Sequence, residues 1–157
     1  MSDKVAVLAF GGETTAKVAA KIANELSAKV CKNAKELTDE AIVVVGTHIR
    51  MGKFDKKFVR FAKKYSGKVK IFTFLVGAAI ESKQKFIEKA QSLTGDRVWY
   101  VWGELNVASA KGLKRFALQA FADGRRQDGL PTPRLLEKEI NALCRAVCEE
   151  HGTNLGE

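Results

Sequence analysis

The chain has 157 residues, of which 46% are hydrophobic, and a formal net charge of +9 at pH 7. That length suits one well-filled domain, residues 1–157, and is too short for two domains of ordinary size. The odd number of cysteines, Cys31, Cys144 and Cys148, argues against a disulfide-stapled secreted protein. No signal peptide or membrane-spanning stretch is visible, so we expect a cytoplasmic protein that can still contact a membrane peripherally.

The positive charge is concentrated in one segment. Residues 50–70 hold nine Lys or Arg residues against the single acid Asp55, a local balance of +8. Such a surface fits nucleic acid, anionic lipid or an acidic protein, and charge alone does not choose among them.

In the first third of the chain, short apolar runs alternate with amphipathic segments. Strands are predicted over residues 4–10, 28–32 and 42–46. A helix is predicted after Gly11 and Gly12, with Thr14 or Thr15 as its cap. Its apolar stripe consists of Val18, Ala19, Ile22, Ala23 and Leu26.

The same alternation continues to residue 103 and then changes. Two further strands are predicted over residues 68–76 and 97–103. Helices are predicted over residues 54–65, 82–93, 107–123 and 134–150. The stripe of the first of these helices comprises Phe54, Phe58, Phe61, Ala62 and Tyr65.

Alternating strands and helices predict an α/β fold with right-handed crossovers and a doubly wound parallel sheet. We expect five strands in the order 2-1-3-4-5, with helices on both faces. The helix at 107–123 and the polar connector after it form an insertion, about 107–131, before the last helix.

In an open parallel sheet, ligands bind beyond the carboxyl ends of the strands, at the switch point between the first and third strands. The loop after the first strand contains Gly11, Gly12, Glu13, Thr14 and Thr15. Glycines let backbone N–H groups approach a ligand, hydroxyls donate, and a helix N-terminus favours anions. The pattern is equally typical of an ordinary turn with a helix cap.

A second loop, residues 47–53, follows the third strand, and a third loop, 77–82, follows the fourth. Gly46 and Gly52 bracket five side chains that no core periodicity requires: Thr47, His48, Ile49, Arg50 and Met51. Ile49 and Met51 could pack on a planar ring, with Arg50 bringing positive charge to it. The alternative is that Arg50 is solvated, Met51 fills core space and His48 is a surface histidine.

The strand IVVVG, the loop THIRMGKF and the helix FDKKFVRFAKKY resemble the flavodoxin-like, menaquinone-dependent protoporphyrinogen oxidases of bacteria. That subgroup shows a G-x-x-I-R-x-G-x-F-x-x-x-F pattern, which is matched by Gly46, Ile49, Arg50, Gly52, Phe54 and Phe58. Gly103, Glu104 and Leu105 resemble the G-A-L that ends the fifth strand of the wider flavodoxin family.

The resemblance implies a bound FMN with its phosphate in the 11–15 loop. The isoalloxazine ring would lie between the 47–53 loop and the 77–82 loop, which adds Gly77 and Ala78. Arg50 is the candidate catalytic residue, either near the N1/C2 edge of the flavin or on a substrate carboxylate. The sequence departs from the family in its phosphate loop, F-G-G-E-T-T in place of T/S-x-T-G-x-T, and in its basic charge.

The resulting hypothesis is a redox protein that exchanges electrons with a tetrapyrrole or with a partner oxidoreductase that has an acidic surface. Whether the chain is itself an enzyme or an electron shuttle stays open. The alternative is a flavin-free binding module that uses residues 50–70 to hold an acidic protein, nucleic acid or an anionic membrane. Nucleic acid is the weakest of these, because the aromatic residues of that helix face the core. No metal site is expected.

Overall fold

The computed structural model describes residues 5–38, 41–77, 80–95, 97–102, 119–120, 123, 127 and 137–155. The strands are β1 (Val5–Phe10), β2 (Lys29–Cys31), β3 (Ile42–Arg50), β4 (Lys53–Phe54), β5 (Lys70–Gly77) and β6 (Val98–Trp102). The α-helices are α1 (Glu13–Leu26), α2 (Lys56–Tyr65), α3 (Lys83–Thr94) and α5 (Glu137–Leu155). Two short 3-10 helices are η2 (Ala34–Glu36) and η3 (Ile80–Ser82).

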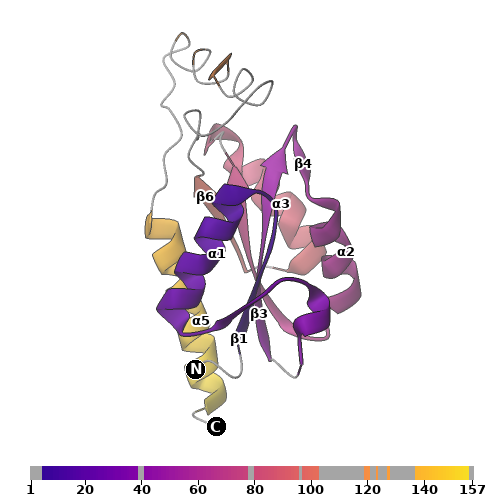
Figure 1. Ribbon diagram of the computed structural model, residues 1–157, viewed down its shortest axis with the longest axis vertical. Helices are drawn as coiled ribbons and strands as arrows, with labels where there is room; N and C mark the ends of the chain where they lie inside the picture. The colour runs from indigo at the N-terminus through magenta and orange to yellow at the C-terminus, as the bar shows by residue number, and fades with distance from the viewer. Residues whose placement is uncertain are drawn as a thin grey trace.

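The sheet has the strand order β2-β1-β3-β5-β6, with all of these neighbours parallel. Helices cover both of its faces, α1 and α5 on one and α2 and α3 on the other (Figure 1). This is the doubly wound, flavodoxin-like order that the sequence predicts. The added strand β4 pairs antiparallel with β3 and lies off the parallel path.

Both faces of the central strands are buried, which explains their continuous apolar runs. Ile42 and Val44 of β3 belong to the core on the α1 and α5 side, together with Val5, Val7, Phe72, Phe74, Ile140 and Leu143. Val43 and Val45 belong to the core on the α2 and α3 side, together with Ala6, Leu8, Phe58, Phe61, Leu75 and Phe86. Successive side chains of a strand thus pack against different helices.

The largest difference from the expected fold is at the end of β3. The sequence predicts a strand that stops at Gly46 and a loop over 47–53, whereas β3 continues to Arg50 and forms a hairpin with β4. Met51 and Gly52 make the turn, with φ of 54° and 74°. Positive φ at both central residues is the geometry of a two-residue hairpin turn that matches the twist of its strands. Glycine readily adopts a positive φ, as Gly52 does here. Methionine rarely does, so Met51 gives no indication of this turn in the sequence.

Two helix starts also differ from the prediction. Gly12 is the N-cap residue of α1 and has no side-chain bond there, so Thr14 and Thr15 lie inside the helix rather than capping it. Helix α2 begins at Lys56 after an Asp55 cap, so Phe54 precedes the helix. Phe54 is nevertheless buried, with its ring edge-on to that of Phe58.

The remaining elements follow the prediction where they are described. Helix α5 buries Ile140, Leu143 and Val147, as its periodicity indicates, and continues past residue 150. The expected helix over 107–123, and the insertion that contains it, fall almost wholly outside the described residues. Residues 103–105 lie outside the described residues as well.

Gly46 is a sensitive position in this packing, because an added Cβ would stand 2.0 Å from Cζ of Phe74. We expect Gly46→Ala to lower the free energy of unfolding by about 1–3 kcal/mol, the usual cost of overpacking a core. Urea denaturation measures the change. The double variant Gly46→Ala, Phe74→Leu should lose less free energy of unfolding than the two single variants lose together. Strictly additive losses would contradict the clash assigned to the Phe74 ring.

Candidate functional site

The candidate site lies at the carboxyl ends of β1 and β3. From β1 the chain turns toward α1 on one face of the sheet, and from β3 it passes through the hairpin to α2 on the other face (Figure 1). Divergence of neighbouring connections to opposite faces is the arrangement that leaves a crevice at a parallel sheet's edge.

The side chains of β3 alternate between the two faces as they reach this edge. His48 and Arg50 follow Gly46 on the α1 side, whereas Thr47 and Ile49 lie on the α2 side. A Cβ built on Gly11 would stand 2.8 Å from Nδ1 of His48, and one built on Gly12 would stand 3.9 Å from an Nη of Arg50. The hairpin therefore brings two basic side chains to the loop that starts α1.

The start of α1 is itself suited to an anion. No side chain caps its first turn, and the first backbone N–H bonded within it is that of Ala16, to the carbonyl of Gly12 at 3.1 Å. The preceding N–H groups have no acceptor inside the helix, and the helix dipole favours negative charge there. Thr15 lies beside Gly11, with its Oγ1 2.6 Å from the position of a Gly11 Cβ. Glu13 is exposed.

His48 is partly buried and only partly paired. Its Nδ1 is buried without a hydrogen-bond partner among the described residues, while Nε2 lies 3.9 Å from a carboxylate oxygen of Asp55. Burial lowers the pKa of His48 below its ordinary value and the nearby Arg50 lowers it further, whereas Asp55 opposes the shift. An anion beside Nδ1 would reverse that balance by favouring the charged imidazolium.

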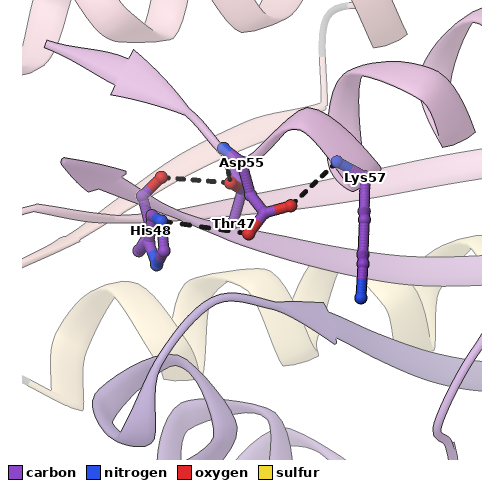
Figure 2. A network of polar contacts seen from close by, with 4 residues as sticks. All are labelled: Thr47, His48, Asp55 and Lys57. Carbon is purple, nitrogen blue, oxygen red and sulfur yellow. Dashed lines mark hydrogen bonds and ion pairs between the residues drawn. The ribbon is translucent and has the colours of Figure 1, made fainter.

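A polar network fixes the base of the hairpin against α2 (Figure 2). The buried Thr47 hydroxyl donates to the backbone carbonyl of His48 and accepts from the backbone N–H of Asp55, both at 3.0 Å. Asp55 in turn accepts from the backbone N–H of Lys57 at 2.8 Å, which caps α2. The sequence analysis missed this role of Asp55, although an Asp directly before an apolar helical stripe is a recognised N-cap pattern.

The other residues expected at the site are more dispersed. Ile49 packs against the core on the α2 and α3 side, away from His48 and Arg50. Met51 lies at the hairpin turn and is 93% exposed. Gly77 ends β5, where an added Cβ would meet the Tyr100 hydroxyl at 2.1 Å, and Ala78 lies outside the described residues. The structure thus brings together Gly11, Gly12, Thr15, His48 and Arg50.

The described residues contain no cluster of three or more His, Cys, Asp or Glu side chains that could hold a metal ion. In the same residues no helix is both long and apolar enough to cross a membrane. Cys144 is buried, and burial raises the pKa of its thiol to about 11, so it remains a neutral, packed side chain.

No family model matches the chain, and no curated protein matches its sequence. A solved structure of a candidate flavoprotein from Bacteroides eggerthii aligns with 76% of this chain and 95% of its own, at 12% identity and a TM-score of 0.43. A flavodoxin, WrbA-like protein from Agrobacterium tumefaciens aligns with 80% of this chain and 99% of its own, at 16% identity and a TM-score of 0.40.

The lowered pKa of His48 predicts a specific dependence of stability on pH. Folding disfavours the charged form of His48 and so lowers its pKa, and the unfolded chain therefore binds more protons as the pH falls through about 6.5. The free energy of unfolding should therefore fall more between about pH 7.5 and pH 5.5 in the wild type than in His48→Gln. Urea denaturation at both values measures this, and equal losses in the two proteins would contradict the assignment.

Proposed function

We propose that the chain is an FMN-binding redox protein whose flavin phosphate binds at the N-terminus of α1. The observation that carries this proposal is the convergence of Arg50 and the unpartnered Nδ1 of His48 on Gly11 and Gly12. These groups meet an uncapped helix start at the switch point of a doubly wound sheet, which is where such folds bind phosphorylated ligands.

Each of these residues has a distinct task in holding the phosphate. The guanidinium of Arg50 supplies a charged donor suited to phosphate oxygens. Nδ1 of His48, which has no hydrogen-bond partner among the described residues, supplies a second donor once protonated. Gly11 has no room for a side chain, because Thr15 and His48 pack against it, so this position beside the proposed phosphate requires glycine. Glu13 is exposed, which leaves its carboxylate free to turn away from the anion.

The conformation of the hairpin turn supports a role for Met51 in contacting the flavin ring. Met51 has a left-handed backbone conformation, which costs an L-residue roughly 1–2 kcal/mol. Its side chain is 93% exposed, so its packing within the chain does not offset that cost. Strain of this kind is concentrated at ligand sites. We assign Met51 as an apolar contact for the isoalloxazine, which when bound supplies the electron-transfer chemistry.

The charges of the hairpin suggest the class of substrate. Arg50 and Lys53 are directly paired across the two strands, so their side chains lie near one another at the exposed end of the hairpin. With Arg50 engaged by the phosphate, Lys53 is the neighbouring cation available to a carboxylate of a tetrapyrrole or of an acidic patch on a partner oxidoreductase.

Titration of the purified protein with FMN at low salt, followed by quenching of flavin fluorescence, tests this proposal. We expect saturable binding that weakens about tenfold or more in Arg50→Ala, because a hydrogen bond to a charged group contributes about 1.5–3 kcal/mol. Arg60→Ala is the matched control, since Arg60 is an exposed arginine on α2 and its removal changes the charge equally. It should bind FMN within about twofold of the wild type.

Two results would overturn the proposal. Absence of any FMN binding by the folded protein would remove the redox function altogether. Binding that Arg50→Ala and Arg60→Ala weaken equally would show that general positive charge, rather than the α1 site, attracts the flavin.

A further inference from the structure

A hollow lies on the α2 and α3 face of the sheet, between β4, α2 and α3. Its volume is about 320 Å³, and it is lined by Lys53, Phe54, Val59, Lys63, Lys89, Ser92 and Leu93. Phe54 packs in the core on the α2 and α3 side, whereas His48 and Arg50 approach α1. The groove therefore lies on the other face of the sheet from the proposed phosphate site, and Lys53 at the end of the hairpin borders both.

The floor of the groove is apolar and firmly packed. Phe54 is only 7% exposed, and its ring lies edge-on to Phe58 with centroids 5.6 Å apart. Val59 and Leu93 pack against the same core but remain partly exposed. The floor is thus a supported apolar surface at which Val59 and Leu93 remain accessible.

The rim of the groove is positively charged. The ammonium of Lys89 lies 5.2 Å from the centroid of the Phe54 ring, a cation–π contact that holds it over the floor. Neither Lys53 nor Lys63 has an ion-pair partner within the described residues, and no acidic side chain lines the hollow. Helix α2 adds further positive charge through Lys56, Lys57, Arg60 and Lys64.

We propose that this groove docks an acidic segment of a partner protein, with one apolar or aromatic side chain on the floor and flanking carboxylates at Lys53, Lys63 and Lys89. Charge complementarity selects the partner's acidic residues, and the hollow between the lysines selects its apolar residue. This inference goes beyond the proposed redox function and does not depend on flavin binding.

The same surface is poorly suited to nucleic acid or to a bilayer. Bases stack on exposed aromatic faces, and a membrane is entered by exposed apolar side chains. The large hydrophobic side chains classed as exposed among the described residues are Val30 and Met51, and neither lines the groove. The occupant must therefore bring its own projecting apolar group into the hollow.

The test is fluorescence anisotropy of the full chain with a labelled peptide that has two glutamates on each side of one tryptophan. Lys63→Glu combined with Lys89→Glu reverses one rim charge on each helix. Lys64→Glu combined with Lys85→Glu is the matched control, because it makes the same charge change on the same helices outside the lining. We expect a loss of affinity of about tenfold or more for the first pair and within about threefold for the control.

A second peptide, with glycine in place of tryptophan, tests the floor and should bind about fivefold or more weakly. The proposal is overturned if both double variants lose affinity equally, or if the glycine peptide binds as tightly as the tryptophan peptide. It is also overturned if neither peptide binds at low salt. Selective loss of binding to polyuridylate RNA or to phosphatidylserine vesicles in the rim variant would assign the groove to a different class of partner.

Discussion

The alternation of side chains along β3 is the constraint on which the candidate site depends. Because successive residues of a strand point to opposite faces, Gly46, His48 and Arg50 must share the α1 side while Thr47 shares the α2 side. A shift of one residue would move both basic side chains away from the start of α1. Two features hold this register: the Phe74 ring packs against Gly46, and β3 pairs in parallel with both β1 and β5.

The hairpin connects this register to function by extending β3 beyond the parallel sheet. Thr47 ties the base of the hairpin to Asp55 at the start of α2, so the basic side chains rest on a supported backbone rather than a free loop. The same hairpin contributes Lys53 and Phe54 to the groove on the opposite face. One short element thus contributes to the proposed phosphate site on one side of the sheet and to the basic, apolar groove on the other.

The sequence predicted the architecture because that depends on periodicity, which buried strands and amphipathic helices display directly. The strand order is confirmed, and the buried faces of α1 and α5 are those that their stripes predict. The hairpin was missed because Met51 occupies a left-handed turn position that sequence rules assign to Gly, Asn or Asp. Without the hairpin, the opposite orientations of His48 and Ile49 could not be foreseen, nor could the position of the Arg50 side chain beside Gly12.

The most direct test of the account is the affinity of the wild-type protein for FMN compared with that for riboflavin, which lacks the phosphate. If Arg50, His48 and the first turn of α1 form a phosphate site, FMN should bind at least about tenfold more tightly at low salt. The preference should shrink as ionic strength rises. Equal affinity for the two flavins would contradict the account, because the phosphate would then gain nothing from the groups that converge on Gly11 and Gly12.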